Sequence, residues 1–443
     1  MVTNMTEGSI TKHLISYSIP LILGNLFQLT YNAVDSIIVG RFIGKEALAA
    51  VGTTSPVMSI IVLGISGICI GASVLMSNFF GAGKEEMVKK EMATTALFGL
   101  YFSIIIVALG ILITKPLLKV LAVPEEILGL ASTYLRIIFL GAPFTFFYNA
   151  ISSALKSVGD SKTPLKFLTF CSVLNGVLDV IFIGFLGFGM ICSAATTVIA
   201  EALSAILSIL YVYRKIPLLQ LKPSEFKIDK GLLKETLQYG SVTALQQSVQ
   251  PIAKLLIQGA VNPMGIDVIA AFNAVQKVEA YACLPEQSIA SGITTFVAQN
   301  AGAKKNERIR DGFRTGMKLE FCYWICICIV VLVLRQPIMK LFVTGQNMEI
   351  VELGSDYLKL MAFFLLFPGF TNGVQGYFRG RKCMKMTLLG TCIQAGLRAV
   401  FVYVLTPYMG LNGVAYACAI GWSAMLLVEI PYYFYYNKNC KRY

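Results

Sequence analysis

Apolar residues in this chain run in long stretches instead of alternating with polar residues over short distances. The segments 51–80, 92–114 and 399–428 contain no charged residue, and 167–200 contains only Asp179. A helix needs about 20 residues to cross the hydrocarbon layer of a bilayer, so each segment is long enough to span it. Because backbone polar groups in hydrocarbon need internal partners, these segments are expected to be helices and not open strands.

The pattern predicts twelve transmembrane helices and therefore an all-α integral membrane protein. The long apolar segment 167–200 is divided into two spans by three glycines, at 184, 187 and 189. The expected spans are 14–40, 51–80, 92–114, 130–155, 165–186, 189–213, 236–260, 266–299, 317–343, 357–378, 386–406 and 411–436.

Composition and charge agree with this class. Hydrophobic residues make up 56% of the 443 residues and charged residues only 14%, against about a quarter charged in soluble domains. The net charge of +13 is unevenly placed, since 26 of the 37 Lys and Arg fall on one side of the predicted spans. By the positive-inside rule that side is cytoplasmic and holds both termini. We therefore expect a multi-pass protein of the cell membrane and no nucleic-acid partner.

Cysteine, histidine and the N-terminus exclude several other classes. The first apolar stretch runs from Leu14 past Val34 without a cleavage pattern, which predicts a retained helix and not a signal peptide. His13 is the only histidine, and no HExxH motif or metal-type cysteine pair occurs. The eleven cysteines lie mostly within spans and are expected to be reduced apolar side chains. We expect neither an enzyme nor a bound cofactor.

The two halves of the chain repeat each other. The segment 81–84 after the second span resembles 302–305 after the eighth, and Lys156 answers Arg379. The order is the same in both halves, which predicts a first lobe at 1–213, a cytoplasmic linker at 214–235 and a second lobe at 236–443. Carriers commonly contain such repeats and bind substrate between them. Glu85 stands where a P-loop needs Ser or Thr, so an ATP-driven pump is not expected.

Two acids at bilayer depth are the first candidates for function, because charged residues there are costly. Asp35 follows Gln28 and Tyr31 on one helix face, and Asp179 follows Asn175 by one turn. Their oxygen atoms suit either Na⁺ or a transferable proton as coupling ion. The alternative for Asp35 is a salt bridge with Arg41 at the membrane surface.

Basic residues occupy the corresponding places in the second half. Aligning Gly40 with Gly259 sets Lys254 opposite Asp35, and aligning the fifth and eleventh spans sets Arg398 opposite Asp179. The repeat is thus expected to have inverted its charge. Lys254 then needs a partner, either Glu279 or Glu286, or reaches an interface through its long side chain. Arg398 is expected to be structural or to contact substrate.

A proline in the first span suggests a mechanical role. Pro20 lies fifteen residues before Asp35 and removes one hydrogen bond from the helix, which permits a kink. We expect a hinge at Pro20. Pro368 and other span prolines are weaker candidates.

At these residues the sequence resembles the multidrug and toxic compound extrusion (MATE) family. The resemblance covers nearly the whole chain and is carried by Pro20, the 28–41 pattern, 81–83, 155–160, 174–179 and 194–197. It implies two pseudo-symmetric six-helix lobes in a V and export of drugs against inward flow of Na⁺ or H⁺. It also implies a cation site, with possible Na⁺, at Asp35, Asn175, Asp179 and Thr197, with Gln28, Tyr31 and Asn149 lining the same cavity.

One departure from the family pattern affects the second lobe. A branch of the family has a Glu in the seventh span, where this chain has Gln246, Gln247 and Gln250. Coupling is therefore expected in the first lobe alone, with Gln247, Lys254, Glu279 and Arg398 lining the second.

The sequence as a whole predicts a monomeric secondary transporter that exports lipophilic or cationic small molecules in antiport with Na⁺ or H⁺. The alternative is a flippase for a lipid-linked oligosaccharide or related lipid precursor. The two deep acids favour drug export over the flippase.

Overall fold

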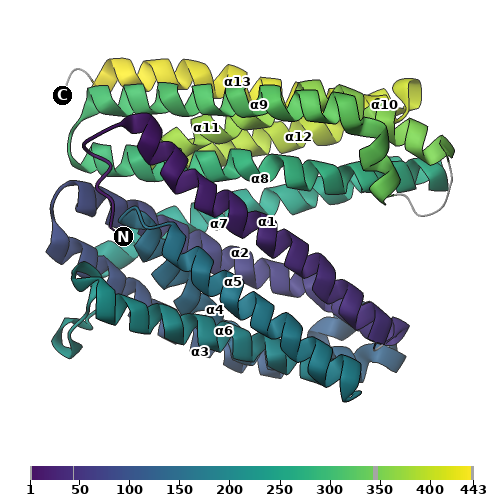
Figure 1. Ribbon diagram of the computed structural model, residues 1–443, viewed down its shortest axis with the longest axis horizontal. Coiled ribbons are helices and arrows are strands. Elements are labelled where there is room, and N and C mark those ends of the chain that lie inside the picture. Colours follow the sequence, from purple (N-terminus) through teal and green to yellow (C-terminus); the bar gives the residue numbers. More distant parts are fainter. Residues whose placement is uncertain (1, 43, 343–347, 441–443) are drawn as a thin grey trace. The chain divides into compact units, whose positions relative to one another are not determined.

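The chain is built of helices joined by short turns (Figure 1). The computed structural model describes residues 2–42, 44–342 and 348–440, without the side chains of 32, 34–41, 45, 48, 439 and 440. The first half contains α1 (Ile10–Phe42), α2 (Lys45–Gly81), α3 (Glu85–Val120), α4 (Glu125–Ser157), α5 (Lys162–Asp179), a π-helical turn (Val180–Phe185) and α6 (Met190–Lys215). The second half contains α7 (Lys230–Val261), α8 (Ile266–Gly302), α9 (Asn306–Phe342), α10 (Met348–Phe364), α11 (Leu366–Gly380), α12 (Met384–Met409) and α13 (Leu411–Cys440). Three short 3₁₀ turns, Pro217–Leu219, Pro223–Glu225 and Asn262–Met264, lie in the connections.

The predicted all-α membrane fold is confirmed. Ten of the twelve predicted spans each lie along a single α-helix, the fifth continues from α5 into the π-helical turn, and the tenth is shared by α10 and α11. Among the described residues, eight helices are long and apolar enough to cross a membrane by length and composition.

The break in the tenth span lies at Leu365, between α10 and α11. Pro368 has no backbone N–H, so the carbonyl of Phe364 loses the donor that an unbroken helix would give it. The proline therefore accounts for a change of helix that hydropathy alone did not reveal.

Matching turns recur in the two halves. The chain turns through Gly83 (φ 70°) after α2 and through Lys304 (φ 58°) after α8. It does so again through Gly159 (φ 85°) after α4 and through Lys382 (φ 63°) after α11. Residues other than glycine rarely adopt this left-handed conformation, so its use by lysine at both second-half positions reflects an inherited backbone. The turns support the internal duplication.

Two compact units divide the chain in a way that exchanges segments between the halves. One unit consists of Met1–Asn4 and Pro20–Ala244, and the other of Met5–Ile19 and Leu245–Tyr443. The division falls inside α1, at Pro20, and inside α7, at Leu245. Each unit thus contains the first turns of the helix that opens the other half.

In the first unit, the start of α7 packs closely on α2. A Cβ added to Gly71 would lie 2.8 Å from the backbone nitrogen of Gly240, and one added to Gly240 would lie 2.7 Å from the Cα of Ile68. The hydroxyl of Thr236 on α7 donates a hydrogen bond to the buried carboxylate of Glu91 on α3. Only glycine permits so close an approach of two backbones.

In the second unit, the start of α1 packs on α8 in the corresponding way. A Cβ added to Gly292 would lie 2.9 Å from the hydroxyl oxygen of Ser18. The hydroxyl groups of Tyr17 and Thr295 form a hydrogen bond of 2.9 Å. In each half, a glycine of the second helix therefore allows the first helix of the other half to pack closely: Gly71 of α2 against α7, and Gly292 of α8 against α1.

Gly71→Ala is expected to lower the stability of the folded protein, because the added methyl group meets backbone that cannot yield. Overpacking of this kind costs about 1–3 kcal/mol. Gly64→Ala on the same helix is the matched control, since a Cβ there meets nothing within 4 Å. Melting temperatures of the two purified variants in detergent measure the difference. Equal melting temperatures would show that the α2–α7 contact is not tight.

Candidate functional site

Asp179 lies at the end of α5, where the helix passes into the π-helical turn. Its side chain is 0% exposed. The hydroxyl of Thr196 on α6 donates a hydrogen bond to its Oδ1. Single π-helical turns occur often at functional sites. The first unit therefore holds a carboxylate in its interior, in a helix of bilayer-spanning length.

Asn175 lies one turn before Asp179 on α5, and Tyr31 of α1 approaches α5 at Gly176, between these two residues. Asn175 is 3% exposed. Its amide nitrogen has no hydrogen-bond partner among the described residues. The ring of Tyr31 lies 3.7 Å from the position of a Cβ on Gly176, so α1 approaches α5 at this level. The structure thus brings a carboxylate, an amide and a phenol onto neighbouring positions.

The hydroxyl group nearest Asp179 belongs to Thr196, whereas the resemblance pointed to Thr197. Thr197 donates to the carbonyl of Ser193 on its own helix, at 2.9 Å. The buried small residues of α6 include Ser193, Thr196 and Ala200, which mark the face turned toward the interior. The spacing alone could not select Thr196, because either threonine can share a helix face with Ser193 and Ala200. A cation role for either threonine stays a prediction.

A second acid of the first unit lies between α4 and α6. The hydroxyl of Thr145 donates to Oε2 of Glu201 at 2.6 Å. The predicted cavity residue Asn149 donates through its amide to the carbonyl of Thr145 at 2.8 Å. Glu201 was not among the sequence candidates, although it is the only acid in α6. Thr145 connects the predicted Asn149 with this further carboxylate.

The other predicted residues of the first span are Asp35, Gln28 and Pro20, and the structure describes the side chains of only the last two. The side chain of Asp35 lies outside the described residues, and its role stays a prediction. Gln28 is exposed on α1. Pro20 is buried and stands where α1 passes from one compact unit to the other. Its action as a hinge likewise stays a prediction.

The three glutamines of α7 begin a polar network in the second unit. Gln246 donates to Oε1 of Gln375 at 2.7 Å, and Gln250 donates to Oε1 of Gln394 at 2.9 Å. The amide nitrogen of Gln247 is buried without a hydrogen-bond partner among the described residues. Amides therefore occupy the place where a branch of the family has an acid.

The predicted charges of the second unit gather around Cys283, which lies within electrostatic range of Lys254, Glu279 and Arg398. Lys254 is exposed and forms no ion pair within the described part of the chain. Arg398 is 3% exposed, and its guanidinium lies 5.9 Å from the centre of the Trp422 ring. The two basic residues thus differ in environment, one accessible and one enclosed.

The expected inversion of charge between Asp179 and Arg398 was wrong by about one helical turn. Asp160 and Cys383 occupy equivalent places before α5 and α12, because each amide donates to the carbonyl five residues earlier. Counting equally along the two helices from these residues sets Arg398 opposite Asn175. The basic Arg398 of α12 therefore stands at the position that the amide Asn175 has in α5.

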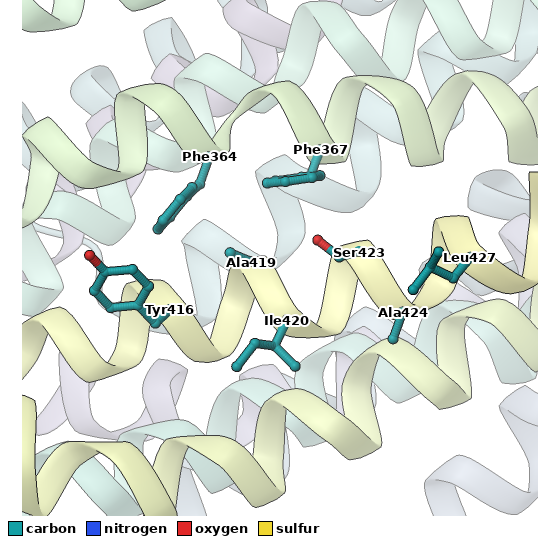
Figure 2. Close-up of a pocket in the computed structure, with 8 residues that line it drawn as sticks. All are labelled: Phe364, Phe367, Tyr416, Ala419, Ile420, Ser423, Ala424 and Leu427. Atoms are coloured by element: carbon teal, nitrogen blue, oxygen red, sulfur yellow. The ribbon is translucent and has the colours of Figure 1, made fainter.

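An apolar groove also lies in the second unit, beside α10, α11 and α13 (Figure 2). It has a volume of about 390 Å³. Its lining consists of Phe364, Phe367, Tyr416, Ala419, Ile420, Ser423, Ala424 and Leu427. Without a carboxylate or amide, this groove offers little to a cation and is not part of the candidate site.

Repeated helical halves, with ionisable groups buried in helices of bilayer-spanning length, define a polytopic membrane protein with an internal duplication. The family model described as MatE matches residues 20–181 and matches again at 243–404. The chain therefore belongs to the MatE family, and the resemblance seen in the sequence is confirmed.

Relatives and solved structures agree with this assignment. The chain is 29% identical to the probable multidrug resistance protein YpnP of Bacillus subtilis, over 98% of this chain and 96% of that protein. It is 23% identical to the multidrug export protein MepA of Staphylococcus saprophyticus, over 96% and 94%. An outward-facing multidrug resistance MATE transporter of the MOP superfamily has a similar fold, with a TM-score of 0.93, 22% identity and coverage of 100% and 99%. A MOP superfamily transporter from Pyrococcus furiosus gives a TM-score of 0.90 at 22% identity, covering 99% and 98%.

Proposed function

We propose that this chain is a secondary active multidrug efflux transporter of the cell membrane, with both termini in the cytoplasm. It exports lipophilic or cationic small molecules in antiport with Na⁺ or H⁺ by alternating access. Membership in the MatE family and the names of YpnP and MepA support this proposal.

The observation that carries the proposal is the enclosed Asp179, with Thr196 as its hydrogen-bond donor. An ionisable group inside a membrane helix is costly and is retained where it serves an ion or proton pathway. A coupling ion shifts the transporter between states only if it binds one state more tightly than the other. A buried carboxylate with an adjacent amide, Asn175, is suited to such state-dependent binding of a cation.

The test is efflux of ethidium from cells that express the protein, with the Na⁺ and H⁺ gradients collapsed separately. Antiport predicts that efflux stops when one gradient is lost and continues when the other is lost, which also names the coupling ion. Cells with an empty vector provide the control. Efflux that persists without either gradient would contradict secondary transport.

The second candidate function is a flippase for a lipid-linked oligosaccharide or related lipid precursor. The enclosed Arg398 favours it, because a buried guanidinium suits the phosphate group of such a lipid. For the solved MOP superfamily transporter from Pyrococcus furiosus, the reverse polarity of the binding pocket suggests a different function. Absence of ethidium efflux from the wild type would favour this candidate.

A further inference from the structure

Two carboxylates that the coupling site does not use meet inside the second unit. Glu286 of α8 is 0% exposed and Glu320 of α9 is 1% exposed. A Cβ added to Gly369 of α11 would lie 3.5 Å from Oε2 of Glu320 and 3.8 Å from Oε1 of Glu286. The two carboxyl groups therefore converge on one point of the α11 backbone.

Neither carboxylate is neutralised by the described part of the chain. None of the four carboxylate oxygens of Glu286 and Glu320 has a hydrogen-bond partner there. The charged group that acts on Glu286 is the acid Glu279, and the one that acts on Glu320 is Glu286 itself. Neither acting group is positive, so a proton or a cation from outside the protein has to balance the charge of the two buried acids.

The other titratable neighbours do not supply that charge. Tyr323 of α9 lies within electrostatic range of both acids, together with the thiols of Cys283 and Cys326. The hydroxyl of Tyr323 donates to the carbonyl of Ala282 at 2.7 Å and not to a carboxylate. A phenol or a thiol is neutral when protonated and negative when deprotonated, so none of these groups can balance the negative charge of the two carboxylates.

Two of the three helices around the pair carry a proline beside it, and the chain is interrupted between α10 and α11 while α8 stays one continuous helix. Pro285 directly precedes Glu286 inside α8 and cannot donate the helical hydrogen bond at its own position. Pro368 directly precedes Gly369 and follows the break at Leu365. Interrupted helices at bilayer depth are tolerated where they line a polar site, and in transporters they surround ion sites.

We propose that Glu286 and Glu320 form a cation site in the second unit, which takes up H⁺ or Na⁺. A proton shared by the two carboxyl groups, or Na⁺ held by their oxygens, balances the buried negative charge. This site is separate from the coupling site around Asp179 and does not depend on efflux.

Binding of radioactive Na⁺ to the purified protein tests the Na⁺ form of the proposal. Glu286→Gln and Glu320→Gln should each remove about one equivalent of bound Na⁺ per chain relative to the wild type. Glu429→Gln is the matched control, since Glu429 is also a fully buried acid of this unit but lies near the positive charge of Arg379. The control should bind as much Na⁺ as the wild type.

Labelling of the wild type with a hydrophobic carbodiimide, mapped by mass spectrometry, tests the H⁺ form without any substitution. The reagent modifies protonated carboxyl groups in apolar surroundings, so a proton site predicts label on Glu286 or Glu320 at neutral pH. The variant Gly369→Ala distinguishes binding of Na⁺ from binding of H⁺. Its methyl group would make ordinary contact with both carboxyl groups, which should block Na⁺ and leave labelling intact.

Loss of Na⁺ binding in both glutamine variants establishes a Na⁺ site. Unchanged Na⁺ binding with carbodiimide label on either glutamate establishes a proton site. Unchanged Na⁺ binding without label on either residue overturns the proposal. Na⁺ binding is compared only between variants whose melting temperature shows that they are folded, whereas the labelling uses the wild type and tests the proton form without any variant.

Discussion

Asp179→Asn is expected to abolish gradient-driven efflux of ethidium while the protein still reaches the membrane. Asparagine keeps the size of the side chain and an oxygen acceptor for the hydroxyl of Thr196. It cannot take up a proton or supply negative charge to Na⁺, so the coupling ion loses its differential binding. The efflux rate at matched expression should fall by about tenfold or more, toward the rate of cells without the transporter.

Neighbouring substitutions sharpen this result. Thr196→Val removes the hydroxyl that reaches Asp179, whereas Thr197→Val removes one that bonds to its own helix. A larger loss of efflux in Thr196→Val is expected. Asp35→Asn should resemble Asp179→Asn if the two acids act together. Wild-type efflux in Asp179→Asn would remove this residue from the mechanism.

Arg398→Met is expected to destabilise the protein strongly. Arg398 is enclosed, acts electrostatically on Glu279 and lies over the Trp422 ring. Methionine removes the positive charge that acts on the half-buried Glu279 and the guanidinium contact with Trp422, at a cost of about 1–3 kcal/mol. The melting temperature of the purified variant in detergent measures the loss.

Two further variants show whether charge is the cause. Adding Glu279→Gln to Arg398→Met should restore part of the lost stability, because the uncompensated acid is then gone. Lys254→Met is the matched single control, since Lys254 is exposed, and should change stability by about 0.5 kcal/mol or less. A melting temperature of Arg398→Met equal to that of the wild type would contradict a stabilising role for the Arg398 charge.

The spans and the repeat could be predicted because their causes are local. Crossing a bilayer needs about 20 apolar residues, and such stretches are visible in any window of the chain. Turns such as 81–84 and 302–305 interrupt them with small and charged residues. The split of the tenth span was less visible, because it arises from Pro368 within an otherwise continuous apolar segment.

The candidate site could be predicted in part. The spacing of Asn175 and Asp179 places both on one helix face, and both are buried. Choosing between Thr196 and Thr197 requires the rotation of α6 about its axis, which adjacent threonines do not reveal. The meeting of Glu286 with Glu320 depends on how α8 and α9 pack, and no pattern within either helix encodes it.

The alignment of the halves failed for a related reason. Apolar helices contain few distinctive residues, so sliding one by a turn keeps the same face inward and changes the match little. The turns before α5 and α12 supply the register that was missing. Backbone hydrogen bonds, and not side-chain identity, correct the position of Arg398.

The exchange of the first turns of α1 and α7 between the two compact units bears on how such a protein could have arisen. If the chain were cut in the connection 216–229, each fragment would lack a helical segment that its own unit requires. A single-repeat ancestor would have met the same need by exchanging that segment with a second copy, as in a domain-swapped dimer. Fusion of two such copies would make the exchange permanent, and each half would then depend on the other for one helical segment.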